Sequence, residues 1–256
     1  MTGTTIDAAA FSKTAPDGFL APSRLVDSVR GRTRAEYILD HGFSAEQINV
    51  KWWAARGIEI TFPTKDAEAP RLTRRDLFAM GNELESEQDL SSFVWHVLAW
   101  GSGNSVRNNL KRLDSIPAHE PLLREALDVA RAGDPRTAYS TLVRRGGGVI
   151  PSLGPAFFTK LLYFASEGND DAVGPRTRCL ILDARVAGSL YRLGWNMAES
   201  YPTPSFSYNW FTDTYVSYCQ LLERWADAAG EGVTPDMFER ALFQRSRSTS
   251  VSPRLD

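Results

Sequence analysis

The most informative stretch of the chain is residues 146–183, which read GGGVIPSLGPAFFTKLLYFASEGNDDAVGPRTRCLILD. Its glycines and Pro151 predict a tight turn at residues 151–154, followed by a helix at residues 155–166 that begins with Pro155. The free backbone N–H groups at such a helix start can bind a phosphate. The stretch therefore predicts an anion-binding turn in front of a helix.

The predicted helix at residues 155–166 is apolar on nearly every side, which is typical of a helix buried at the centre of a domain. Lys160 is the exception, because a lysine in such a place must extend to solvent, pair with an acid or line a cavity. Burial would also lower the pKa of its amine, as a nucleophile requires. A lysine that merely extends to solvent is the more common alternative.

Asp183 follows the apolar run Cys179–Leu182 and opens a helix predicted at residues 184–193. An aspartate at a helix start is a natural N-cap, and capping alone would explain this residue. The same carboxylate could also stabilise positive charge or activate a water molecule. Asp183 is therefore a candidate for either role.

Two segments resemble the helix-hairpin-helix DNA glycosylase superfamily. Ile150–Gly154 looks like its Leu-Pro-Gly-Val-Gly hairpin, and Leu182–Val186 looks like the aspartate segment that follows the hairpin. Gly168–Pro175 supplies the loop that separates the two. The sequence from Leu153 to Phe164 is similar to that of a bacterial branch with the 8-oxoguanine glycosylase fold. Some members of this branch act in phage defence. The resemblance covers about residues 89–229.

The sequence departs from the superfamily pattern at two positions of the hairpin. Ser152 replaces the first hairpin glycine, and Ala156 stands where lyase-competent relatives carry their lysine. Lys160 lies one helical turn beyond Ala156, so the two share a helix face. If the enzyme also nicks the strand, Lys160 is the candidate that would form a Schiff base with the sugar.

The resemblance implies an all-α, two-lobed fold with a central cleft, and removal of a base from duplex DNA. Asp183 would then be the catalytic carboxylate below the sugar, whose bond breaks through a cation. The backbone of the hairpin would bind DNA through four consecutive residues, Leu153, Gly154, Pro155 and Ala156. A superfamily segment enters the gap left by the flipped nucleotide, and its counterpart here offers Asn104 and Arg107. An equally good interpretation of this segment is a loop followed by a capped helix, with Arg107 on the solvated face of that helix.

Aromatic side chains are the expected lining of a pocket for an extruded base. Trp100, Tyr208 and Trp210 are the candidates, although most aromatic residues after residue 205 have the spacing of an ordinary core stripe. His96 lies on an apolar helix and is interpreted as a buried histidine with satisfied hydrogen bonds.

The composition limits the class of protein. With 256 residues, of which 43% are hydrophobic, the chain can form one large core or two small lobes. Two cysteines are too few for an iron–sulfur cluster, and no metal spacing or nucleotide-binding loop is present, so we expect no metal and no cofactor. Without a signal peptide or a long apolar run, we expect a cytoplasmic protein that binds no membrane. We also expect a monomer.

The charge pattern leaves DNA binding open. A formal charge of −2 is low for a DNA-binding protein, but basic residues gather in groups such as Arg107, Lys111 and Arg112. Such groups suit a basic groove, and solvated helix faces produce them equally well.

Helix signals recur along the whole chain, and the sum is about ten helices. We expect a flexible segment at residues 1–22, a single domain with two lobes at residues 23–243 whose hairpin spans about residues 146–166, and a flexible tail at residues 244–256. The predicted helices lie near residues 33–41, 44–56, 73–80, 89–100, 105–114, 120–132, 135–145, 155–166, 184–193, 206–229 and from 235 onward. Residues 58–62 alternate like a strand but are interpreted as an extended connection.

The leading hypothesis is a metal-free DNA glycosylase that acts on 8-oxoguanine or on modified bases of phage DNA. The first alternative is a non-catalytic helix-hairpin-helix module that binds DNA. The second is an unrelated helical protein that needs no cleft. The sequence leaves the excised base and the opposite-base preference open.

Overall fold

The computed structural model describes residues 14–63, 69–144, 147–166, 178–195, 197 and 210–248. Within these ranges the chain is mostly helical, with two small sheets of two short strands each. The prediction of an all-α fold is confirmed.

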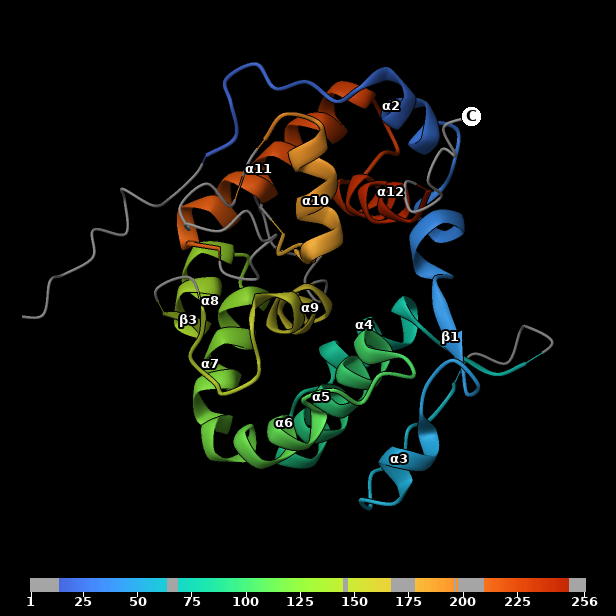
Figure 1. Ribbon diagram of the computed structural model, residues 1–256, viewed down its shortest axis with the longest axis vertical. Coiled ribbons are helices and arrows are strands. Elements are labelled where there is room, and N and C mark those ends of the chain that lie inside the picture. Colours follow the sequence, from blue (N-terminus) through green and yellow to red (C-terminus); the bar gives the residue numbers. More distant parts are fainter. Residues whose placement is uncertain are drawn as a thin grey trace, which may run out of the picture.

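Helix α9 (Pro155–Ala165) lies at the centre of the molecule, as its apolar sequence predicts (Figure 1). It packs against four helices that precede it in the chain, which are α4 (Arg74–Asn82), α5 (Glu87–Ser102), α7 (Glu120–Arg131) and α8 (Pro135–Leu142). Gly81 brings α4 against the backbone of α9, because an added Cβ would lie 2.2 Å from the carbonyl oxygen of Phe164. The central helix is therefore enclosed by close packing.

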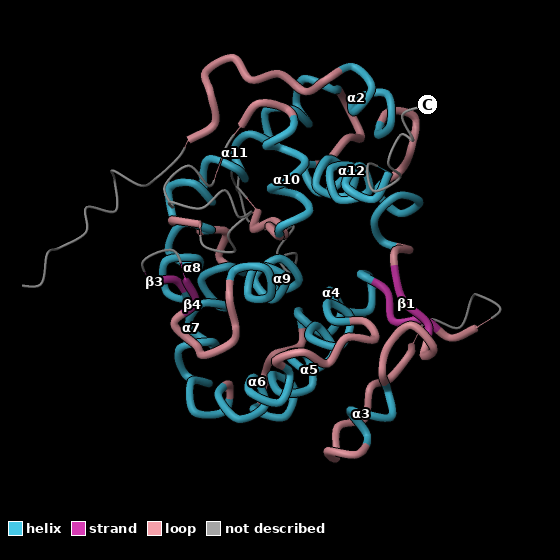
Figure 2. The backbone as a smooth tube through the Cα atoms, in the orientation of Figure 1, coloured by secondary structure: helices cyan, strands magenta, loops and turns pink. Residues whose placement is uncertain are grey.

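The helices form two lobes, one on either side of α9 (Figure 2). The first lobe is continuous in sequence and consists of α4, α5, α6 (Asn109–Ser115), η2 (Pro117–His119), α7 and α8. The second lobe combines both ends of the chain, because α12 contacts α2 and η1 as well as α10 and α11. Its members are α2 (Ser23–Val29), η1 (Ala35–Leu39), α10 (Ala184–Arg192), α11 (Thr212–Ala229) and α12 (Pro235–Ser248).

Two short antiparallel sheets join neighbouring segments. Strand β1 (Gly42–Ser44) pairs with β2 (Arg71–Thr73), and β3 (Val143–Arg144) pairs with β4 (Gly147–Gly148). Strands of two or three residues carry too little periodicity to be predicted from sequence. Residues 58–62 have no regular secondary structure, in agreement with their interpretation as a connection.

The local helix signals succeed at α4 and fail at α3 (Val50–Ala54). The capping box of Thr73 and Asp76 begins α4 as predicted. Ser44 and Gln47 were expected to begin a helix, but they only close a turn, in which the Ser44 N–H donates to the Gln47 side chain. Asn49 is the N-cap instead, because its side chain accepts from the Trp52 N–H.

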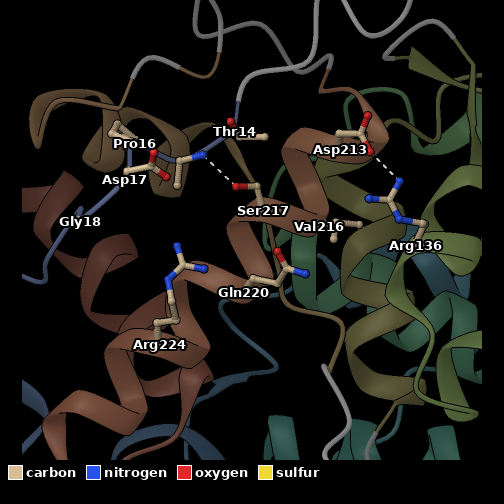
Figure 3. A pocket seen from close by; sticks show the side chains of 11 residues that line it. Thr14, Pro16, Asp17, Gly18, Arg136, Asp213, Val216, Ser217, Gln220 and Arg224 are labelled. Atoms are coloured by element: carbon tan, nitrogen blue, oxygen red, sulfur yellow. Dashed lines mark hydrogen bonds and ion pairs between the residues drawn. The ribbon is translucent and has the colours of Figure 1, made fainter.

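The chain is ordered closer to both ends than the sequence suggests. Residues 14–22 are expected to be flexible, yet the Ala15 N–H donates to Ser217 Oγ at 2.8 Å (Figure 3). The Trp225 indole also donates to the Phe19 carbonyl. Helix α12 continues to Ser248, past the expected end at residue 243. Residues 1–13 and 249–256 lie outside the described residues.

The extended segment Cys179–Leu182 crosses the core between α9 and α11. Its backbone is paired with side-chain hydroxyl groups, because no neighbouring strand is present along it in the described structure. Thr159 Oγ1 accepts from the Leu182 N–H at 3.1 Å. Tyr215 both accepts from and donates to Leu180, and Tyr218 donates to the Ile181 carbonyl at 2.7 Å. These hydroxyls fix the segment that leads into Asp183.

We expect Thr159→Val to lower the free energy of unfolding by about 1 to 3 kcal/mol, because the buried Leu182 N–H would lose its acceptor. The matched control is Thr141→Val. Thr159 donates to the Pro155 carbonyl four residues earlier, and Thr141 makes the equivalent bond to the Thr137 carbonyl at the surface. Urea unfolding measures both variants, and equal losses would contradict the proposed anchoring role of Thr159.

Candidate active site

Asp183 is the N-cap of α10, as its sequence position predicts. Its Oδ1 accepts from the N–H groups of Arg185 at 2.9 Å and Val186 at 3.1 Å. The other carboxylate oxygen, Oδ2, lies 3.7 Å from Lys160 Nζ. The carboxylate is therefore fixed by one oxygen and directs the other toward the lysine of α9.

Lys160 is buried, and its Nζ donates to the carbonyl of Ala156 one turn earlier. Burial lowers the pKa of the Lys160 amine, although the nearby Asp183 carboxylate opposes this shift. Gly101 of α5 provides space for the side chain, since a Cβ at this position would lie 3.1 Å from Lys160 Cδ. The structure thus brings together the two residues predicted to carry the chemistry.

A cavity of about 70 Å³ lies beside this pair and is lined by residues from both lobes. By its volume it would hold on the order of five water molecules. The residues around it are His41, Phe43, Arg74, Trp100, Gly101, Lys160, Ile181, Asp183, Glu239 and Phe243. We call it the cleft cavity. Asp183 therefore reaches a space that could receive part of a ligand.

A second, wider cavity of about 430 Å³ adjoins the turn before α9. Gly101 lines this cavity as well as the cleft cavity, so the two are neighbours. Its lining consists of Gly101, Ser102, Ser105, Arg107, Asn108, Arg112, Ser152, Gly154, Ala156 and Phe157. We call it the hairpin groove.

The predicted turn at residues 151–154 is held by α6. Arg112 Nε donates to the Ser152 carbonyl at 2.9 Å, and Ser115 Oγ donates to the Pro151 carbonyl at 2.8 Å. The Arg112 guanidinium also lies over the Phe157 ring, 3.6 Å from its centroid. Burial lowers the pKa of Arg112 to about 10, so the side chain remains charged at neutral pH.

The four backbone residues predicted to bind DNA differ in what they can donate. The N–H of Leu153 already donates to the Ile150 carbonyl inside the turn, and Pro155 has no N–H. The N–H groups of Gly154 and Ala156 have no acceptor among the described residues. Both of these residues line the hairpin groove, so they are the two available donors of the predicted set.

The two predicted contacts to the partner base occupy different positions. Arg107 is exposed and lines the hairpin groove. Asn104 is also exposed, but its side-chain amide donates to the Glu46 carbonyl at 3.2 Å, and it does not line the groove. The structure therefore supports a role at the groove for Arg107 more directly than for Asn104.

Of the aromatic residues predicted to form a base pocket, Trp100 lines the cleft cavity. Trp210 does not, because it is 1% exposed in the core, where its carbonyl accepts from the Tyr139 hydroxyl. We correct that assignment. Tyr208 lies outside the described residues.

His96 has the satisfied environment that its sequence suggests. Its ring nitrogens contact the Ser92 carbonyl and the Thr61 N–H, and burial lowers its pKa. It does not line the cleft cavity.

No pattern in the sequence indicates the ion pair of Arg74 and Glu239, which also lines the cleft cavity. The two residues are 165 positions apart, and each has neighbours typical of an ordinary surface helix. Only the packing of α4 against the second lobe brings them together. Among the described residues, no group of three or more His, Cys, Asp or Glu side chains could hold a metal ion.

These features define a class of mostly helical proteins with two lobes and a carboxylate in the cavity between them. The family model described as "Putative 8-oxoguanine DNA glycosylase OGG-like protein" matches residues 36–243, and the chain belongs to this family. No curated protein and no solved structure matches the chain. No helix in the described ranges has the length and apolar character needed to span a membrane.

We expect Ser152→Gly to raise the free energy of unfolding by about 1 kcal/mol, because Ser152 has a φ of 64°, a conformation that glycine adopts without strain. Ser152→Ala keeps the Cβ and should bring no such gain. Thermal unfolding measures both variants. If the alanine variant gained as much as the glycine variant, backbone strain would not be the cause.

Proposed function

We propose that the protein flips a damaged or modified base out of duplex DNA and cleaves its N-glycosidic bond. The observation that carries this proposal is the pairing of Asp183 with Lys160, 3.7 Å apart, on the wall of a cavity between the lobes. Membership of the glycosylase family supports the same reaction class. The substrate we infer is either 8-oxoguanine or a modified base of phage DNA.

The geometry of Asp183 suits a reaction that passes through a sugar cation. Two N–H groups at the start of α10 hold Oδ1, so the carboxylate keeps one orientation. Oδ2 lies near Lys160, which lines the same cavity as Asp183, and its negative charge would stabilise the cation and accept a proton from the attacking water. Such fixed charges assist catalysis because they need no reorganisation during the reaction.

The hairpin groove is the surface that we assign to the DNA backbone. It combines the N–H groups of Gly154 and Ala156, at the start of the 11-residue helix α9, with the guanidinium groups of Arg107 and Arg112. Helix starts and arginine side chains both bind phosphate oxygens. The local positive charge here offsets the net charge of −2 of the whole chain.

Lys160 gives the enzyme the means for a second reaction, in which the strand is nicked at the abasic sugar. A Schiff base requires a neutral amine, and the lowered pKa of Lys160 increases its neutral fraction at physiological pH. In a bifunctional enzyme the amine nitrogen would attack C1′ of the sugar and the base would leave with the bonding electron pair. Loss of a C2′ proton from the resulting Schiff base would then expel the 3′ phosphate, which nicks the strand. The Asp183 carboxylate beside it would accept the proton that the amine loses.

We expect Asp183→Asn to reduce base release by at least about a hundredfold while DNA affinity is retained. Asparagine is also a good N-cap, so α10 should still begin normally and only the negative charge is lost. The measurement is single-turnover release of bases from duplexes that carry different lesions, followed by mass spectrometry.

The matched control is Asp134→Asn. Asp134 is also a helix N-cap, because it accepts from the Thr137 N–H at the start of α8, and it is far from Asp183 in the sequence. It should release bases at the wild-type rate. Normal release by Asp183→Asn would remove the proposed mechanism.

We expect borohydride to trap a covalent adduct between wild-type protein and lesion DNA, and Lys160→Ala to lose it completely. Because the pKa of Lys160 is lowered, the trapping rate should rise with pH and level off at a lower pH than for an ordinary lysine. Lys51→Ala, which alters an exposed lysine of α3, is the control and should trap normally. An adduct that persists in Lys160→Ala would exclude this nucleophile.

A further inference from the structure

The ion pair of Arg74 and Glu239 lies on the wall of the cleft cavity, together with Asp183. Both residues are 1% exposed, and Arg74 Nη1 lies 2.8 Å from Glu239 Oε2. Arg74 belongs to α4 of the first lobe and Glu239 to α12 of the second. The pair therefore joins the two lobes at the place where a flipped base would enter.

Arg74 retains one hydrogen-bond donor that the described residues do not use. A guanidinium carries five N–H groups. Nε donates to His41 Nδ1, and Nη1 donates to the Tyr163 hydroxyl and to Glu239 Oε2. Nη2 has one long contact, 3.4 Å to Glu239 Oε1, and its second N–H has no acceptor among the described residues. Buried donors are rarely left unpaired, so this N–H indicates a ligand or water in the cavity.

Glu239 places an acceptor next to this donor. Its Oε1 receives only the long contact from Nη2, so it keeps lone pairs for a further hydrogen bond. The pair thus presents a donor and an acceptor side by side. The complementary edge on a nucleobase is a carbonyl oxygen next to a ring N–H, and arginine commonly donates to such carbonyl oxygens.

The charges around the cleft cavity favour an uncharged occupant. When Lys160 is protonated, its charge and that of Arg74 balance the charges of Asp183 and Glu239, and all four residues line the cavity. A purine that carries a fixed positive charge after alkylation of a ring nitrogen would face the unpaired N–H of Arg74. That contact would bring two positive charges together even where the base keeps its carbonyl next to a ring N–H.

A second ion pair, linked through Tyr163, holds the Arg74 side chain in place. The Tyr163 hydroxyl, which accepts from Arg74, donates to Asp236 Oδ2 at 2.8 Å, and Asp236 binds Arg34 at 2.8 Å. All of these side chains except Arg34 are buried. Groups locked in this way can discriminate between ligands because they cannot move to suit the wrong one.

We propose that Arg74 and Glu239 read the edge of the flipped base and restrict excision to neutral bases in which a carbonyl lies next to a ring N–H. Arg74 Nη2 would donate to the carbonyl oxygen, and Glu239 Oε1 would accept from the N–H. This inference rests on the proposed function, because it concerns the base that the same site excises.

The test compares base release from duplexes that carry 8-oxoguanine, O6-methylguanine or 7-methylguanine. The first has the neutral carbonyl and N–H edge, the second lacks it, and the third is cationic. We expect wild-type protein to release the first at least about tenfold faster than the other two. Glu239→Gln, in which an amide N–H₂ replaces one oxygen, should reduce release of 8-oxoguanine at least about tenfold.

Arg74→Lys keeps the positive charge but removes the Nη2 donor, so it provides a second test if Glu239→Gln folds poorly. The matched control is Glu120→Gln, which alters an ion pair with Arg124 on α7 and should leave release unchanged. Affinity for DNA with an abasic site should be the same in all variants, because the base is absent there.

The outcomes separate the two proposals. If the wild-type protein releases no base from these duplexes or from phage genomic DNA, the proposed function itself fails. If it releases bases without this edge as fast as 8-oxoguanine, the reading role of the pair is overturned while the glycosylase proposal stands. The reading role is likewise overturned, and the glycosylase proposal stands, if folded Glu239→Gln and Arg74→Lys both keep the wild-type order of release rates.

Discussion

Three hydroxyl groups that pair with the backbone of residues 180–182 determine the arrangement of the whole site. An extended segment inside a helical core has no strand beside it, and its N–H and carbonyl groups must still be satisfied. Thr159 from α9 and Tyr215 and Tyr218 from α11 meet this need. A shift of the segment by one residue would break these pairs and turn Asp183 away from Lys160.

The two lobes are held in register by buried charges as well as by apolar packing. Arg74 with Glu239, and Arg34 with Asp236, connect segments that are far apart in sequence, and the Tyr163 hydroxyl links the two pairs. Buried ion pairs add little net stability, because desolvation of the charges offsets their attraction. Removing one partner is far more costly, so such pairs favour a single arrangement of the surrounding elements.

Local signals allowed much of the fold and part of the site to be predicted. The apolar helix at residues 155–165, the cap at Asp183 and the capping box of Thr73 and Asp76 all depend on residues within a few positions of one another. Trp210 in the core and the pair of Arg74 with Glu239 could not be inferred, because they depend on how distant helices pack. The failed helix start at Ser44 has the same origin, since the Asn49 N–H donates to the Gly103 carbonyl of another segment.

The second lobe contains both the earliest and the latest helices of the described chain, and Arg34 meets Asp236 across 202 positions. During synthesis on the ribosome, α4 to α8 emerge as a continuous block and can begin to fold at once. Helix α2 must wait, with its apolar side unprotected, until α12 has emerged. The order of translation therefore makes completion of the cleft cavity the final event in the folding of this protein.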